Sequence, residues 1–382
     1  MSFLMFIQAS HLMKKFTIPN DLLISYKTPY FTSGFVRHNA TNCAFTTDES
    51  WVILNPIEQS IKRKIEAVGT PLKDWDIQIN YGIKTGCNEA FIIDEAKRAE
   101  LIAADPKSAE IIRPILRGRD IKRYGYEWAH LHLIATFPAR HYDIEKYPAV
   151  KHYLMSFDKE RLLEAGLDDI ANNAALLADF CRQRLEQSGR DIIINGHKVI
   201  IDGKAQKARK KTGNKWFETQ DQIGYWEDFN RPKIVWAETM RIKRENKDRF
   251  PRFSYIDKAI YTDKTCFMAV GEELYVILAI LNSVIGRYQL SQTVAMMDNG
   301  GYLMQKIYIE EVRIPTVTSV IAEKIKEGIM GLLDTKLSLH QHELLEQEID
   351  TLVFKSFGLT ANEQKYINWI IAQELGKRTR KS

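Results

Sequence analysis

A change of hydrophobic periodicity near Pro315 is the feature of this 382-residue sequence that most constrains its fold. Before Pro315, short segments such as WDIQINYGI (75–83) alternate apolar and polar residues, which is typical of strands. After Pro315, IAEKIKEGIMGLLDTKL (321–337) spaces its apolar residues at helical intervals. The sequence therefore predicts a mixed α/β chain, in which a domain of strands and helices is followed by a C-terminal helical spacer.

The length of the chain exceeds what one domain usually holds, and its 45% hydrophobic content is sufficient for a real core. Residues 51–316 are expected to form the main domain. Residues 1–50 have poor periodicity and many polar residues, and they are predicted to be a loosely ordered leader or connector. The charged outer faces of residues 317–382 suit either a spacer or a surface on which another helix docks.

Positive charge is concentrated in two stretches, although the net charge of the chain is only +5. Residues 204–216 hold six basic residues and no acid, and residues 231–252 hold eight basic and three acidic residues. This segregation favours a basic face over an ordinary surface, and hence a nucleic-acid partner. The candidate contacts in these stretches are Lys207, Arg209, Lys210, Lys211, Lys215, Arg231, Lys233 and Arg241.

The segment RGRDIKRYGYEW (117–128) interleaves basic and aromatic residues. Guanidinium groups suit phosphate and guanine contacts, and a solvated basic turn is an equally acceptable interpretation. The candidate DNA contacts are Arg117, Arg119, Lys122 and Arg123.

The loop YGIKTGCNEAF (81–91) superficially resembles a phosphate-binding loop. Its glycines Gly82 and Gly86 are too close together for a P-loop, and Lys84 lies between them rather than after the second. The dinucleotide-binding pattern is absent as well. The segment is predicted to be a turn between two strands, 75–83 and AFIID (90–94), which could present Lys84, Thr85 and Asn88 to DNA. Asparagine suits bidentate pairing with adenine, and lysine suits guanine or phosphate.

The cysteines argue against a zinc site or a disulfide framework. The four are far apart and form no CxxC pair. Free thiols suit a reducing cytoplasm, which is the predicted location. No apolar run approaches the length of a membrane span, and the N-terminus lacks the features of a signal peptide.

Catalytic patterns are scarce in the sequence. The tetrapeptide NPIE, which begins at Asn55, differs from the NPPY-type motif of enzymes that flip a base. It lacks the second proline and the aromatic residue that would stack on the flipped base. No glycine-rich loop for S-adenosylmethionine is evident either. Asp228 with Glu245 to Lys247 could be fitted to a metal-dependent nuclease pattern, but Glu363 to Lys365 matches it equally by chance. No catalytic, cofactor-binding or metal-binding residue is therefore predicted.

Four collinear blocks carry a family resemblance: 79–94, 105–124, 215–238 and 261–283. They resemble the Taq I-like C-terminal specificity domain of type IIG restriction-modification enzymes. WVILNPIEQSIKRKIEAVGTPLKDWDI (51–77) resembles the segment that precedes this domain, and LEQEIDTLVFKSFGLTANEQKYI (345–367) resembles its terminal helical tail. The resemblance covers about residues 48–372.

The resemblance implies a domain that reads a DNA sequence. In that family, separate upstream regions methylate adenine and cut DNA, and this sequence shows the reader without those parts. No cofactor is expected on this chain; S-adenosylmethionine and Mg²⁺ would belong to a catalytic partner or an upstream region. The expected partners are double-stranded DNA and a separate methyltransferase or endonuclease polypeptide held by the C-terminal helices. Two alternatives stay open: a methyltransferase or nuclease with unrecognised motifs, and a protein-interaction subunit.

Overall fold

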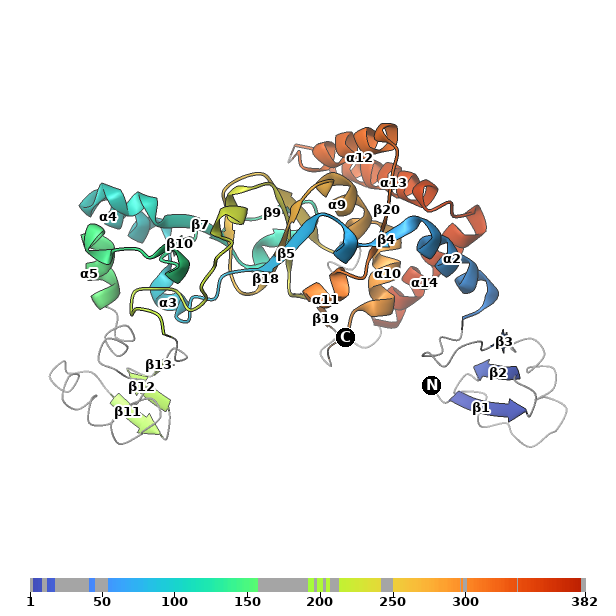
Figure 1. The fold of residues 1–382 in the computed structure, drawn as a ribbon, viewed down its shortest axis with the longest axis horizontal. Helices are drawn as coiled ribbons and strands as arrows, with labels where there is room; N and C mark the ends of the chain where they lie inside the picture. The colour runs from blue at the N-terminus through green and yellow to red at the C-terminus, as the bar shows by residue number, and fades with distance from the viewer. Residues whose placement is uncertain are drawn as a thin grey trace.

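A computed structural model describes side chains and main chain for residues 54–155, 213–241, 250–295, 297, 301–334 and 336–373. It describes the main chain alone for residues 3–8, 12–17, 41–44, 156, 192–195, 198–201, 204–206 and 374–378. Helices and several small sheets alternate along the chain (Figure 1), so the predicted mixed α/β class is confirmed.

The central element is an antiparallel sheet with the strand order β16-β14-β18-β5. Because side chains alternate between the faces of a strand, β14 separates two hydrophobic cores: Ile234 and Trp236 belong to the first and Val235 to the second. All of β14 is buried, which explains the apolar run IVWA that follows Lys233 in this strand. The strands are β16 (Phe253–Ile256), β14 (Lys233–Ala237), β18 (Cys266–Gly271) and β5 (Ile77–Tyr81).

The second core lies against another sheet, in the order β17-β7-β10-β6, in which only β17 and β7 are parallel. Its largest fully buried side chains include Phe91, Phe137 and Phe229. The strands are β17 (Tyr261–Thr262), β7 (Ile112–Leu116), β10 (His132–Ile134) and β6 (Ile92–Ile93), and the neighbouring helices are α3 (Asn88–Phe91), α4 (Glu95–Ala104) and α5 (Pro148–Ser156). The predicted strand 90–94 is thus found only in part: Ile92 and Ile93 form β6, whereas Ala90 and Phe91 end the helical turn α3 and pack into this core.

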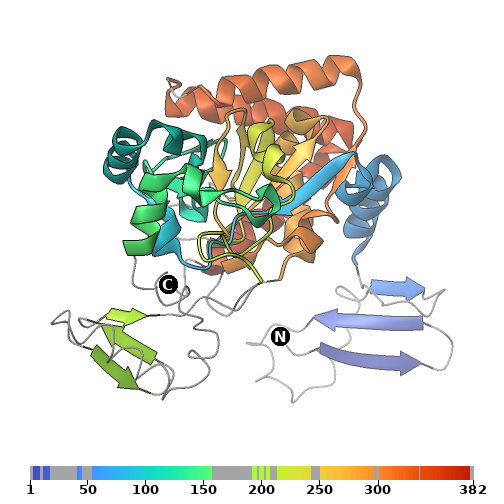
Figure 2. The same ribbon diagram turned by 60° about the vertical axis from the view of Figure 1, so that its left-hand side comes forward.

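The first core is covered by α2, which precedes the central sheet in sequence, and by the helices that follow β18, on the side opposite the second core (Figures 1 and 2). They are α2 (Pro56–Val68), α9 (Leu274–Asn282), α10 (Val284–Thr293), α11 (Lys306–Ile309), α12 (Ser319–Leu332), α13 (Leu339–Ser356) and α14 (Ala361–Arg378). Ile325, Ile349 and Ile367 of the C-terminal helices are buried together with Ile277 of α9. The helical tail therefore packs on its own chain, while the domain boundary at residues 316 and 317 stays a prediction.

Smaller antiparallel pairs complete the fold. They are β4 (Gly69–Pro71) with β20 (Arg313–Pro315), β8 (Ile121–Lys122) with β9 (Gly125–Tyr126), and β15 (Thr239–Arg241) with β19 (Gly301–Leu303). Two three-stranded sheets are described by their main chain: β1 (Phe3–Gln8), β2 (Leu12–Thr17) and β3 (Thr41–Ala44); and β11 (Ile192–Asn195), β12 (Lys198–Ile201) and β13 (Lys204–Gln206). The leader, expected to be loosely ordered, thus contains strands.

Within the described residues, no single helix has the length and apolar character to cross a membrane. The pair α9 and α10 meets that criterion only jointly, across a bend of 72°.

Candidate nucleic-acid interface

The turn from Thr262 to Cys266 brings together two of the stretches singled out in the sequence. Ile83 donates its main-chain N–H to the carbonyl of Thr262, and Gly82 donates to that of Cys266, both at 2.8 Å. On the other side, the N–H of Gly118 donates to Oγ1 of Thr265 at 2.8 Å. The loop 81–88 and the basic turn 117–120 are therefore fixed to the same short segment.

The close approach at this turn requires glycine at position 82. A Cβ atom on Gly82 would lie 2.0 Å from the carbonyl oxygen of Asp263. Gly86 has φ of +80°, a left-handed conformation that other residues adopt only with strain. Both glycines thus shape the loop, as the sequence predicted for a turn.

A third stretch, residues 213–231, covers the other side of the loop. The N–H of Gln220 donates to the carbonyl of Lys84 at 3.1 Å. The hydroxyl of Tyr225 donates to the carbonyl of Tyr81 at 2.9 Å, and the two rings meet edge to face. The loop 81–88 is therefore held from both sides by segments more than 130 residues away in sequence.

Exposed basic side chains and exposed or half-buried aromatic side chains lie on these segments and on a turn attached to them. Lys84 and Asn88 are exposed, and Tyr81 is 53% exposed. The exposed guanidinium of Arg140 lies over the rings of Tyr142 and Trp226, at 5.1 and 5.3 Å from their centroids. A main-chain bond from Ala139 to Gln222 attaches this turn to the 213–231 segment. We refer to Tyr81, Lys84, Asn88, Arg140, Tyr142 and Trp226 as the aromatic–basic cluster.

Sequence reasoning missed Arg140. It is a single arginine in PARHY (138–142) and does not belong to a basic run, so charge counting gives no signal for it. The signal that was present is the aromatic residue two positions later, because arginine and an aromatic ring together suit both phosphates and bases.

Burial and the charge of Lys84 act in opposite directions on the pKa of Asp221, the acid next to the cluster, and burial has the larger effect. Burial raises the pKa of Asp221, and the positive charge of Lys84 opposes that rise. The N–H of Asp221 also donates to the carbonyl of Lys84 at 3.3 Å. Asp221 thus partly balances Lys84 and fixes its main chain.

Lys233, predicted to contact DNA, lies inside the protein. Its Nζ atom donates to the carbonyl oxygens of Phe229, Arg231 and Lys258, at 2.8, 3.2 and 2.9 Å. The side chain is fully buried, and this burial lowers its pKa to about 8. We therefore assign Lys233 to the fold rather than to a DNA contact.

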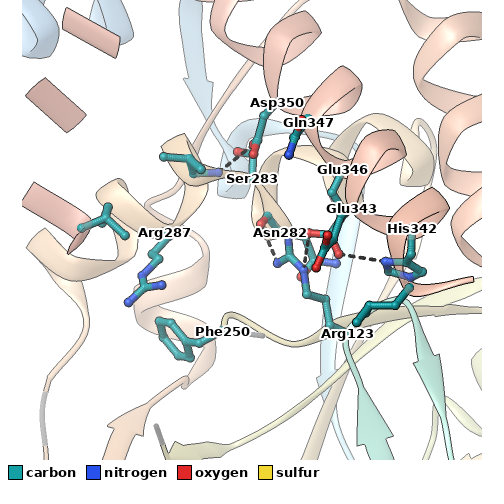
Figure 3. Close-up of a pocket in the computed structure, with 13 residues that line it drawn as sticks. Arg123, Phe250, Asn282, Ser283, Arg287, His342, Glu343, Glu346, Gln347 and Asp350 are labelled. Atoms are coloured by element: carbon teal, nitrogen blue, oxygen red, sulfur yellow. Dashed lines mark hydrogen bonds and ion pairs between the residues drawn. The ribbon is translucent and has the colours of Figure 1, made fainter. Parts of the chain in front are cut away.

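Arg123 also has internal partners, as the close-up in Figure 3 shows. Its guanidinium donates to Oε2 of Glu346 on α13 and to the carbonyl oxygens of Pro251 and Asn282. Only 9% of the side chain is exposed.

Thr85 is fully buried as well, and its hydroxyl donates to Asn88. The side chains of Arg123 and Thr85 are likewise reassigned from DNA contact to structure.

The remaining candidates are more accessible. Arg119, Lys215 and Arg241 are exposed, whereas Arg117 makes a two-fold hydrogen-bonded pair with Asp120. Lys122 is half-buried and pairs with Glu127 at 3.1 Å, and exposed Arg231 pairs with Asp228 at 3.2 Å. Four candidates lie outside the described residues: Lys207, Arg209, Lys210 and Lys211.

The acids of the nuclease pattern have structural partners. Asp228 accepts hydrogen bonds from Asn80 and Arg231, and Glu363 accepts from Lys64, Ser60 and Thr360. Glu245 to Lys247 lie outside the described residues. In the part of the chain with described side chains, no three His, Cys, Asp or Glu residues are grouped as metal ligands.

A cavity of about 300 Å³ lies between α13 and the junction of α9 and α10 (Figure 3). Charged residues from several elements line it, including Arg123, Arg287, Glu346 and Asp350. Asp350 accepts a hydrogen bond from the N–H of Val284 at the start of α10, and burial raises its pKa to about 6. These contacts fasten α13 to the first core.

Comparison with known proteins finds no family model and no curated protein that matches this chain. Solved structures with a similar arrangement include the type IIL restriction-modification enzyme MmeI in complex with DNA (12% identity, TM-score 0.43, 89% of this chain and 40% of that chain). Another is the type IIG restriction endonuclease BpuSI (12% identity, TM-score 0.41, 78% of this chain and 33% of that chain). This chain thus spans less than half the length of either enzyme.

Proposed function

We propose that this chain recognises double-stranded DNA, as the sequence-reading part of a restriction-modification system. The observation that carries the proposal is the assembly of the aromatic–basic cluster. Three segments distant in sequence are held together by main-chain hydrogen bonds, and they present exposed Tyr81, Lys84, Asn88 and Arg140 beside half-buried Tyr142 and Trp226. These are the residue types that contact phosphates and base edges.

Phosphate contacts supply most of the affinity in this proposal. Arg140 and Lys215 are exposed: Lys215 lies on the segment 213–231, which is hydrogen-bonded to the loop 81–88, and Arg140 lies on the turn that is hydrogen-bonded to this segment. Arg119 is exposed on the turn fixed to the Thr262–Cys266 segment. Neutralising phosphates releases counterions, so binding weakens steeply as salt increases. Base contacts come from the loop itself, where Asn88 and Lys84 are exposed.

A fluorescence-anisotropy titration of a labelled duplex, at two salt concentrations, tests the proposal. We expect binding at low salt that weakens strongly at higher salt. Absence of binding at low salt, or binding insensitive to salt, contradicts it. Incubation with labelled S-adenosylmethionine, Mg²⁺ and mixed DNA addresses the enzyme alternative, since methyl incorporation or cleavage by the pure chain overturns the assignment as a reader alone.

The proposal includes a cytoplasmic location and a separate catalytic polypeptide that binds S-adenosylmethionine and Mg²⁺. A shallow groove of about 500 Å³ between α12 and α13 favours docking of such a partner. Leu345, Ile349 and Leu352 line it, and Lys324 and Glu348 flank it with opposite charges. A pull-down from the source cell with the full chain and with a Leu345→Asp variant tests this role. Recovery of the same partner by both proteins contradicts docking in this groove.

A further inference from the structure

We propose that Asn88 acts as a hydrogen-bond donor to a base edge and therefore selects guanine at one position of the recognised site. The inference rests on the proposed function, because it assumes that the loop 81–88 faces DNA. It replaces the pairing with adenine that the residue type alone suggests, since the structure fixes the polarity of the Asn88 amide.

The polarity is set by a neighbouring buried hydroxyl. Thr85 is fully buried, and its Oγ1 donates to Oδ1 of Asn88 at 2.6 Å. No other acceptor for this hydroxyl is found among the described residues. Rotating the amide by 180° would place Nδ2 against Oγ1 and leave the buried Thr85 proton without an acceptor, which is costly. The oxygen of Asn88 therefore faces the protein.

The main chain at Asn88 is held in place as well. Phe91 and Ala90 are fully buried and anchor the short helix α3 that begins at Asn88. The main-chain N–H groups of both residues donate to the carbonyl of Cys87 at 3.1 Å. Asn88 is exposed while its supports are buried, and with Oδ1 turned towards Thr85 the amide nitrogen is the side-chain atom left to donate to a ligand.

The pattern of donors and acceptors in the major groove then ranks the bases. Bidentate pairing with adenine needs the oxygen and the nitrogen of the amide to face the base edge together, and Oδ1 of Asn88 is turned towards Thr85 instead. Guanine presents two acceptors, N7 and O6, and suits a donor-only group. Adenine and thymine each offer one polar acceptor, and the exocyclic amine of cytosine is a donor. Exposed Lys84, on the same loop, prefers guanine for the same reason.

Selection of duplexes from a pool with randomised positions, followed by sequencing, tests the inference with the full chain. The wild-type protein should select guanine at one position, and Asn88→Ala should lose that preference by roughly tenfold while other positions are unchanged. Thr85→Val removes the hydroxyl at nearly constant volume and frees the amide to rotate, so adenine should become accepted there. Thr85→Ser is the matched control, because it keeps the hydroxyl and should keep guanine.

Asn88→Asp gives a second measurement in case Thr85→Val is unstable in thermal denaturation. It converts the side chain to an acceptor, so the preference should shift from guanine to cytosine or adenine. A wild-type protein that selects a site in which no base depends on Asn88 overturns this inference alone. Folded Thr85→Val that selects the same bases as the wild type overturns it too. A wild-type protein that retains no duplex overturns the proposed function together with it.

Discussion

Arg123 donates from Nε and Nη2 to a single oxygen of Glu346, at 2.9 and 2.6 Å, and so joins the turn between β8 and β9 to helix α13. The two residues are 223 positions apart. His342, one helical turn before Glu346, lies 3.2 Å from its other oxygen. A residue from the basic segment is thus an anchor for the helical tail, and its charge is not available to the surface.

Replacing Arg123 should therefore destabilise the fold without changing DNA binding in the way a phosphate contact does. Arg123→Ala leaves Glu346 with its main partner removed, and we expect a loss of about 3 kcal/mol in the free energy of unfolding. Urea denaturation measures this. Arg119→Ala, on the exposed neighbour, should change stability by less than about 0.5 kcal/mol. Equal stability of the two variants contradicts the anchoring role.

Glu363 makes stability depend on pH in the acidic range. Burial raises the pKa of this carboxyl, but hydrogen bonds from Lys64, Thr360 and Ser60 lower it by a larger amount. The net result is a pKa of about 2, compared with an ordinary value of 4.5. A depressed pKa means that the stabilisation is present above about pH 4.5 and is lost as pH falls towards 2. Glu363→Gln should thus cost on the order of 2 kcal/mol at pH 6 and much less at pH 3.

Urea denaturation of both proteins at pH 6 and pH 3 checks this expectation. Glu323→Gln is the matched control, because this glutamate is exposed on α12, and its effect should be small at both values. A Glu363→Gln cost that is the same at pH 3 as at pH 6 contradicts the assignment.

The sequence alone locates the basic runs but does not predict which of their side chains are exposed. The runs at 204–216 and 231–252 are visible to charge counting, but the fate of each side chain is decided by distant partners. Lys233 is buried because its strand β14 lies between two cores, where the carbonyls of Phe229 and Lys258 satisfy its ammonium. Nothing within a short window of sequence distinguishes it from exposed Lys215.

Regular elements were easier to predict than their contacts. The strand 75–83 and the helices after Pro315 have periodicities set by burial on one face, and both are found in the structure. The predicted strand AFIID is found only in part, because Ala90 and Phe91 turn inward as the end of α3 and only Ile92 and Ile93 form the strand β6. The aromatic–basic cluster could be anticipated only in part, since Arg140 joins it through Gln222 and Trp226.

Gly82→Ala should displace the loop 81–88. The added methyl group would meet the main chain of Asp263 and Thr262 rather than a movable side chain, so the loop itself must shift. We expect a loss of about 2 to 3 kcal/mol in the free energy of unfolding and weaker DNA binding. Gly125→Ala is the control, because a Cβ atom there meets nothing within 4 Å. If both variants bind DNA and unfold as the wild type does, the close contact of Gly82 with the main chain of Asp263 does not fix the loop.

Arg140→Gln should weaken binding to all duplexes alike, because a phosphate contact carries no sequence information. Its guanidinium is held over Tyr142 and Trp226 and does not need ordering when DNA binds. Removing one such contact should reduce the slope of log Kd against log salt concentration by about 1, as measured by anisotropy titrations at several salt concentrations. Lys324→Gln, at an exposed lysine of α12, is the matched control and should leave the slope unchanged. An unchanged slope for Arg140→Gln, or an equal reduction for both variants, removes Arg140 from the interface and attributes the salt dependence to net charge alone.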